Sequence, residues 1–135
     1  MALDDRDLVD WTAFASARNE LGAGFVRILG YFREDGVKSV AAIEAAMRAQ
    51  SAAGLVLPAH TLKGESRQFG AEPLGMLAER IETIARDCVE NRDTPEEALA
   101  LVASLRPLFE RTLSVLEHEA NPIVARRGGF GRRVA

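Results

Sequence analysis

The strongest constraint on the fold is a helical spacing of apolar residues that recurs along most of the chain. In a helix of 3.6 residues per turn, apolar side chains at positions i, i+3, i+4 and i+7 share one face. Such stripes predict a short helix over 7–19 and longer helices over 21–50, 55–70, 72–90 and 95–119. Four long amphipathic helices joined by short turns bury their stripes most simply as an antiparallel bundle. The sequence therefore predicts an all-α fold, an antiparallel four-helix bundle with an additional short N-terminal helix.

Two glycines and a proline divide the first half of this pattern. The apolar stripe stays in phase across Gly36, which predicts one long helix that is loosened near that residue. Gly54 is expected to end this helix. Pro58 is then expected in the first turn of the next helix, where a proline is tolerated.

The second half contains similar signals. Gly70 and Pro73 bracket the end of the third long helix, because the residue before a proline is pushed out of the helical region. Thr94 is expected to cap the last helix, with Pro95 at its first position. Pro107 lies inside that helix and is expected to kink it or to leave a carbonyl without its hydrogen-bond donor.

Length and charge limit the classes of protein to which this bundle can belong. The chain has 135 residues and a net charge of −3, which fits one domain and does not favour nucleic acid as a partner. Its apolar runs are far shorter than the ~20 residues that a membrane span needs, and its acidic N-terminus does not resemble a secretory signal. A single cysteine, Cys88, fits a reducing compartment. We expect a cytoplasmic bundle over residues 1–120 and a flexible basic tail over 121–135.

The segment AHTLKGESRQFGA, residues 59–71, combines a histidine with an unusual set of neighbours. On a helical wheel with ~100° between residues, Lys63, Gly64 and Arg67 fall within about 60° of His60. The opposite side carries Leu55, Leu62, Ser66 and Phe69. This helix therefore buries its leucines and phenylalanine and turns the histidine toward solvent.

An exposed histidine with these neighbours suits phosphoryl transfer. Neutral imidazole is available as a nucleophile near neutral pH, and Lys63 supplies a point charge suited to phosphoryl oxygens. Gly64 is costly inside a helix, but its missing side chain leaves room for a bulky partner beside His60. Phosphoryl transfer requires mainly in-line positioning and charge neutralisation, which a partner with an aspartyl phosphate and a metal ion could complete. Taken singly, each residue is better explained as a solvated surface residue, and only the combination favours this function.

The same segment resembles the signature of histidine-containing phosphotransfer (HPt) domains. That signature has a histidine, a variable residue, leucine, lysine, glycine, a second variable residue, a small residue and a later glycine. The stretches VDWTAFASARNELG, FVRILGYFRED and LGMLAERIE are also similar to family segments, so the resemblance covers roughly residues 8–118. It implies a four-helix bundle whose exposed histidine accepts a phosphoryl group from an aspartate of a receiver domain and passes it to another.

The resemblance also implies roles for individual positions. His60 is the implied phosphoacceptor and Lys63 supports the phosphoryl group, while Ser66 matches the small buried position and Gly70 the turn that ends the helix. In some family members a glutamine of the following helix hydrogen-bonds the histidine ring. Here that position is Glu82, which can accept from a ring N–H but cannot donate to a phosphate. The positions expected to contact the partner are Gly64, Arg67, Gln68 and Glu82.

The implied partners are response-regulator receiver domains, which supply Mg²⁺, and a hybrid histidine kinase. We expect a monomer with no cofactor, no metal site of its own and no nucleic-acid or membrane partner. No ATP-binding segment follows the histidine helix, so we expect a phosphate carrier without a catalytic domain. Two alternatives stay open: a scaffold that binds a receiver without taking phosphate, and the phosphoacceptor domain of a kinase split across chains.

Overall fold

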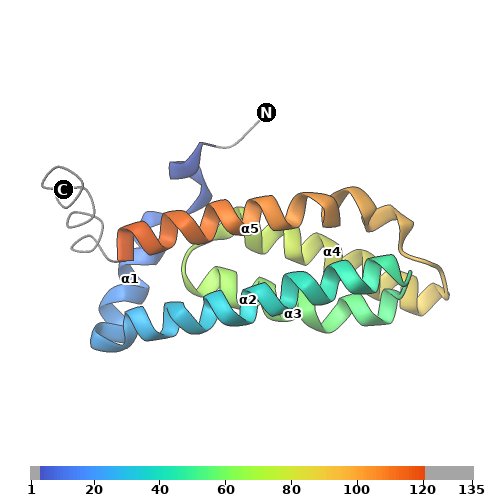
Figure 1. The fold of residues 1–135 in the computed structure, drawn as a ribbon, viewed down its shortest axis with the longest axis horizontal. Coiled ribbons are helices and arrows are strands. Elements are labelled where there is room, and N and C mark those ends of the chain that lie inside the picture. Colours follow the sequence, from blue (N-terminus) through green and yellow to red (C-terminus); the bar gives the residue numbers. More distant parts are fainter. Residues whose placement is uncertain (1–3, 121–135) are drawn as a thin grey trace, which may run out of the picture.

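The chain folds into a ring of four long helices. The computed structural model describes residues 4–120 and contains no strand in that range. Its elements are η1 (Asp5–Leu8), α1 (Trp11–Leu21), η2 (Gly22–Gly24), α2 (Phe25–Arg48), α3 (Ala52–Gln68), α4 (Glu72–Asn91), η3 (Glu96–Ala98) and α5 (Leu99–Ala120), where η marks a 3-10 helix. Both α2 and α4 pack against α3 on one side and α5 on the other, and α1 lies at one end of the bundle (Figure 1). The predicted four-helix bundle is confirmed, whereas the predicted tail over 121–135 lies outside the described residues.

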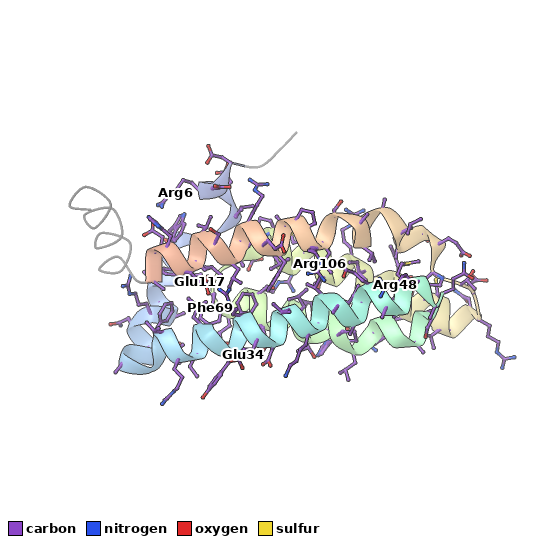
Figure 2. All side chains as sticks on the ribbon, viewed as in Figure 1. Arg6, Glu34, Arg48, Phe69, Arg106 and Glu117 are labelled. Atoms are coloured by element: carbon purple, nitrogen blue, oxygen red, sulfur yellow. The ribbon has the colours of Figure 1, made fainter. Side chains whose placement is uncertain are left out.

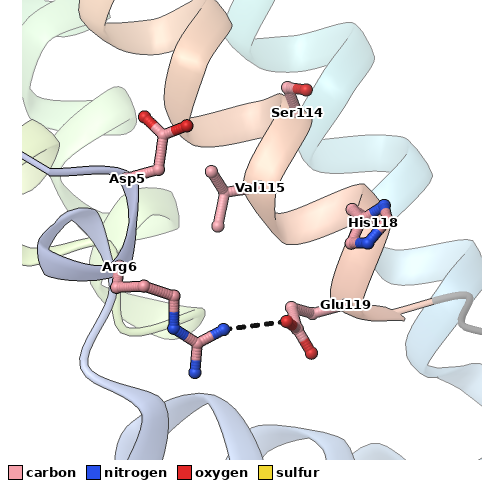
Figure 3. A pocket seen from close by; sticks show the side chains of 6 residues that line it. All are labelled: Asp5, Arg6, Ser114, Val115, His118 and Glu119. Carbon is pink, nitrogen blue, oxygen red and sulfur yellow. Dashed lines mark hydrogen bonds and ion pairs between the residues drawn. The ribbon is translucent and has the colours of Figure 1, made fainter.

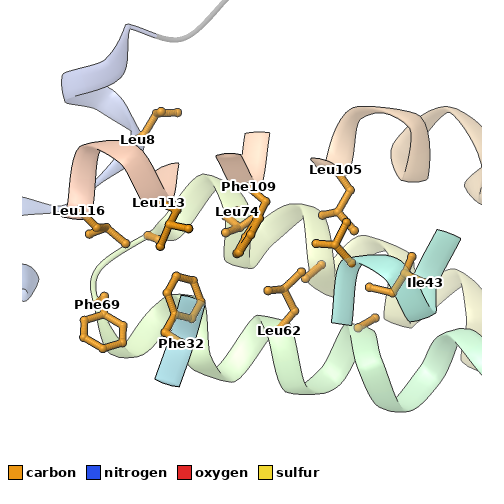
Figure 4. Packing of buried hydrophobic residues seen from close by; sticks show 14 of the residues in the cluster. Leu8, Phe32, Ile43, Leu62, Phe69, Leu74, Leu105, Phe109, Leu113 and Leu116 are labelled. Atoms are coloured by element: carbon orange, nitrogen blue, oxygen red, sulfur yellow. The ribbon is translucent and has the colours of Figure 1, made fainter. Parts of the chain in front are cut away.

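The core lies between the four long helices and extends under η1. Its large side chains include Leu8, Phe32, Ile43, Leu62, Phe69, Leu74, Leu105, Phe109, Leu113 and Leu116 (Figure 4). Burying one such side chain stabilises the fold by ~1.5–3 kcal/mol. The Phe69 ring lies between those of Phe25 and Phe32, with centroid distances of 5.7 and 5.5 Å. This contact anchors the end of α3 in the core.

A serine and a glycine set the two ends of α3. The Ser51 hydroxyl accepts a hydrogen bond from the Gly54 N–H at 3.0 Å and caps the first turn. At the other end Gly70 has a φ of +78°, and a Cβ there would lie 2.6 Å from the Asp10 carbonyl oxygen. The Gly70 carbonyl in turn accepts a 2.7 Å bond from the Asp10 N–H. Gly70 therefore ends α3, as predicted, and also docks it against the start of α1.

The prediction that Gly54 ends the second helix is wrong. Gly54 lies in the first turn of α3, which begins at Ala52 because Ser51 caps it. Pro58 consequently lies inside α3 and not in its first turn. Its ring removes one backbone N–H, which leaves the Gly54 carbonyl without its helical donor.

The predicted loosening at Gly36 is also wrong, because α2 continues through that residue. A Cβ at Gly36 would lie 2.4 Å from Phe109 Cε1, so this glycine allows α2 and α5 to approach closely. The same two helices are joined by ion pairs of Glu44 with Arg106 and of Arg33 with Glu117. Figure 2 labels Arg106 and Glu117, the α5 members of these pairs. The α2–α5 contact therefore combines a buried glycine with charges at its edge.

Helix starts account for the remaining differences. The predicted first helix is split into η1 and α1, because the Asp10 carboxylate caps α1 by accepting from the N–H groups of Thr12 and Ala13. Thr94 does not cap the last helix; its hydroxyl donates to Glu96 at 2.6 Å. A 3-10 turn therefore precedes α5, which begins at Leu99. Pro107 lies inside α5, which continues through it as a single helical segment.

Candidate functional site

His60 lies within α3 on the face turned away from the core. Its side chain is 55% exposed, whereas Leu62 and Phe69 on the opposite face are fully buried. Ser66 is fully buried as well, in agreement with the small inward position expected there. The two opposed faces predicted for this helix are therefore confirmed. The histidine faces solvent, and the opposite face of the same helix is packed in the core.

The carboxylate of Glu82, on the neighbouring helix α4, connects the polar groups around this histidine. Glu82 Oε2 lies 3.0 Å from His60 Nδ1, and Oε1 forms an ion pair with Lys63 Nζ at 2.8 Å. Arg86 follows one turn later on α4 and contacts Oε2 through Nη2 at 2.8 Å and Nε at 2.9 Å. Glu82 is only 5% exposed. A nearly buried carboxylate is thus joined to two cations and to the histidine ring.

This environment keeps Glu82 ionised. Burial alone raises the pKa of a carboxyl group, but the contacts with Lys63, Arg86 and His60 outweigh burial and lower the pKa of Glu82 to about 2. An ionised carboxylate only accepts hydrogen bonds, so the partner nitrogen Nδ1 of His60 carries the hydrogen. In the neutral ring the lone pair is then on Nε2, which makes no hydrogen bond with residues 4–120. The arrangement fixes both the ring and its reactive nitrogen.

Lys63 and Gly64 differ in how far they are available to a partner. The Lys63 side chain is 21% exposed and is held by Glu82. Gly64 is exposed, and a Cβ built there meets no atom within 4 Å. The surface beside His60 is therefore open at Gly64 without any packing reason for a glycine, as the sequence suggested.

Arg67 and Gln68, the other predicted contact residues, lie at the end of α3. Arg67 pairs with Glu79 at 3.1 Å and with Glu72 at 3.7 Å. A Cβ at Gly75 would lie 3.0 Å from Arg67 Cγ, so the arginine stem lies over that glycine. Arg67 thus bridges α3 and α4, while Gln68 is exposed.

Sequence reasoning missed Arg86. Its only signal is the spacing of four residues from Glu82, which places the two side chains on one face of α4. A neighbouring carboxyl on α3, Glu65, behaves differently from Glu82, because burial, followed by the carboxyl of Asp35, raises its pKa to about 7. The pKa of Glu65, which follows Gly64 in the chain, is therefore raised, whereas that of Glu82, which contacts His60, is lowered.

The other histidine and the cysteine lie apart from the group around Glu82. His118 lines a hollow of about 270 Å³ with Asp5, Arg6, Ser114, Val115 and Glu119, where Arg6 pairs with Glu119 at 2.9 Å (Figure 3). Cys88 is buried, and burial raises the pKa of its thiol. Within residues 4–120 no group of three His, Cys, Asp or Glu side chains is placed to hold a metal ion. None of the helices in that range has the length and apolar character required to cross a membrane.

Comparison with known proteins places this chain in a family. The Hpt-domain family model matches residues 27–119, which include all of α3 and α4. The structure is similar to histidine-containing phosphotransfer protein B (HptB) from Pseudomonas aeruginosa PAO1, with a TM-score of 0.75 and 23% identity over 85% of this chain and 96% of that chain. At that identity the likeness shows a shared fold. No curated protein sequence matched the chain. Because the family model spans most of the sequence, the chain belongs to the Hpt-domain family, whose members carry out histidine phosphotransfer in phosphorelays.

Proposed function

We propose that this protein is a phosphorelay intermediate that accepts a phosphoryl group on His60 from the aspartyl phosphate of one receiver domain and passes it to another. The observation that carries the proposal is the contact between His60 Nδ1 and the ionised Glu82, at 3.0 Å, on an otherwise open face of α3. It leaves Nε2 as the nitrogen available to attack. A surface histidine without such a partner would be free to change its rotamer and tautomer.

The proposed transfer is a direct displacement at phosphorus. The Nε2 lone pair attacks the phosphorus in line, an Nε2–P bond forms, and the P–O bond to the receiver aspartate breaks so that the aspartate leaves as a carboxylate. The imidazole keeps its hydrogen on Nδ1 and becomes positively charged, and Glu82 stabilises that charge. Transfer to the next receiver reverses these steps, with a new aspartate as the nucleophile.

The neighbouring residues have supporting roles in this proposal. Lys63 turns from Glu82 toward the phosphoryl oxygens, and Gly64 leaves space for the loops of the receiver. Arg67 and Gln68 lie at the edge of the docking surface. The receiver brings Mg²⁺, a hybrid histidine kinase supplies the phosphate to the relay, and the protein acts as a cytoplasmic monomer.

The experiment is incubation of the purified protein with receiver domains from the same genome that carry a labelled aspartyl phosphate. We expect label on the protein that is lost in acid and survives base, as a phosphoramidate does. His60→Gln should abolish the label and change the free energy of unfolding by no more than ~0.5 kcal/mol, because the side chain is exposed. His118→Gln is the matched control, since His118 is the only other histidine of the chain, and should keep the label.

The other outcomes identify the alternatives. Persistent label on the His60→Gln variant contradicts the assignment of the phosphoacceptor. A protein that binds a phosphorylated receiver without taking label is a scaffold on the same fold. Label that arrives only from ATP and a separate kinase domain, and never from a receiver, identifies a split kinase.

A further inference from the structure

Arg86 shares an oxygen atom with the histidine. Its Nε and Nη2 atoms lie 2.9 and 2.8 Å from Glu82 Oε2, the same oxygen that faces His60 Nδ1 at 3.0 Å. Lys63 is on the other oxygen, Oε1, at 2.8 Å. Lys63 thus pairs with one carboxylate oxygen and Arg86 with the other. Only Arg86 holds the oxygen that also faces the histidine ring.

The two cations differ in what happens to them when the ring carries a phosphoryl group. That group brings ~1.5–2 negative charges, and Lys63 lies about one turn from His60 on the same helix face. If Lys63 moves to it, Arg86 is the only cationic side chain that stays on Glu82 beside the phosphorylated ring itself. Removing two of the cations around a nearly buried carboxylate is strongly unfavourable. Without Arg86, Lys63 would therefore be held on Glu82 and withheld from the phosphoryl group.

We propose that Arg86 is a positioning residue for phosphoryl transfer: it keeps Glu82 compensated and aligned on His60 Nδ1, which frees Lys63 to contact the phosphoryl group. This inference rests on the proposed function of His60. It assigns Arg86 no contact with phosphate or receiver. Its effect passes through the Glu82 carboxylate alone.

The test is a double-mutant cycle in single-turnover phosphotransfer from a labelled receiver. Arg86→Ala should lower the maximal transfer rate by about fivefold, which corresponds to the ~1 kcal/mol of a partly exposed ion pair. The receiver concentration at half-maximal rate should not change, because Arg86 does not contact the receiver. Arg86→Lys should restore most of the rate, since an ammonium group also compensates the carboxylate.

The second arm of the cycle is Glu82→Gln, which removes the charge that Arg86 compensates. In that background Arg86→Ala should have no further effect on the rate. Arg80→Ala is the matched control, because Arg80 is an exposed arginine of α4 that lies with Thr83, Ile84 and Glu97, away from Glu82. It should transfer at the wild-type rate.

Two results overturn the inference. An Arg86→Ala variant that transfers as fast as wild type shows that Glu82 does not need this cation. An equal loss in both backgrounds shows that Arg86 contacts the phosphoryl group or the receiver directly. Failure of the proposed function looks different, because the wild-type protein itself would then take no label on His60.

Discussion

The face around His60 and the contact between α2 and α5 are built from the same two ingredients and use them differently. Each has a glycine inside a long helix, Gly64 in one and Gly36 in the other. Each also has a glutamate paired with an arginine, Glu82 with Arg86 and Glu44 with Arg106. At the α2–α5 contact Phe109 fills the space left by the glycine, whereas beside His60 that space is empty.

The glutamates of the two regions, Glu44 and Glu82, differ in exposure and in the number of their partners. The Glu44 side chain is 26% exposed and contacts one arginine, while that of Glu82 is 6% exposed and contacts two cations and the histidine. One region therefore uses its glycine and its ion pair to join two helices. The other keeps an open surface and places a buried charge beneath a solvent-facing ring. This contrast separates a structural contact from a site, and four predictions test it.

The largest expected effect is on acid stability, through Glu82. Its pKa of about 2 is below the ~4.3 of an unfolded glutamate. A lowered pKa contributes stability above the unfolded value, and this contribution is lost as the pH falls toward 2. We expect the wild-type advantage over Glu82→Gln in unfolding free energy to shrink by about 3 kcal/mol between pH 6 and pH 2. Urea unfolding at each pH measures it.

Glu44→Gln is the control for this prediction. The hydrogen bond from Arg106 lowers the pKa of Glu44 as well, but that pair is at the edge of a helix contact. Its pH-dependent contribution should be at most ~1 kcal/mol. If the two glutamine variants lose the same amount between pH 6 and pH 2, the distinction between a buried and an edge carboxylate is wrong.

The next effect is on packing at Gly36. A Cβ there would lie 2.4 and 2.5 Å from two ring atoms of Phe109, which is 2% exposed. Gly36→Ala should therefore lower the free energy of unfolding by ~1–3 kcal/mol, despite the better helix propensity of alanine. Thermal unfolding measures the change. In a Phe109→Leu background the same substitution should cost less, and an unchanged cost would show that the ring is not the obstacle.

These glycines also show how far the sequence could predict the structure. The wheel of the His60 helix predicted its two faces correctly, because burial of Leu62 and Phe69 depends only on helical spacing. A glycine inside a helical stripe predicts a weak point, and no local signal at Gly36 reports that Phe109, distant in sequence, packs on it. Gly54 was read as a helix end because glycine often has that role, whereas the cap at Ser51 decided the boundary.

For the site, too, the positions within one helix could be predicted from the sequence, whereas the contacts between helices could not. His60, Lys63 and Gly64 follow one another on one helix, so that their common face could be derived from the sequence. Glu82 came from the family resemblance, and its contact with His60 depends on how α3 and α4 are packed. Arg86 was not found, because an arginine four residues after a glutamate is common on helix surfaces.

A third prediction concerns the open surface at Gly64. Gly64→Gln places a long side chain beside His60, where a docking receiver would need the space. We expect phosphotransfer to slow by about tenfold, which corresponds to ~1.4 kcal/mol in the transition state. The thermal unfolding midpoint should not fall, because the added side chain meets no neighbouring atom. Normal transfer by this variant would show that the receiver does not approach over Gly64.

The smallest effect is the most direct comparison of the two regions, because it uses the same substitution as at Gly36. Gly64→Ala adds a methyl group where nothing lies within 4 Å, and the residue is inside a regular helix. The only remaining term is helix propensity, which favours alanine by up to ~1 kcal/mol. We therefore expect Gly64→Ala to raise the free energy of unfolding by that amount while Gly36→Ala lowers it. Urea unfolding of the two variants under one set of conditions measures both signs. If Gly64→Ala is destabilising, its glycine has a packing role like that of Gly36, and the open surface is not there for a partner.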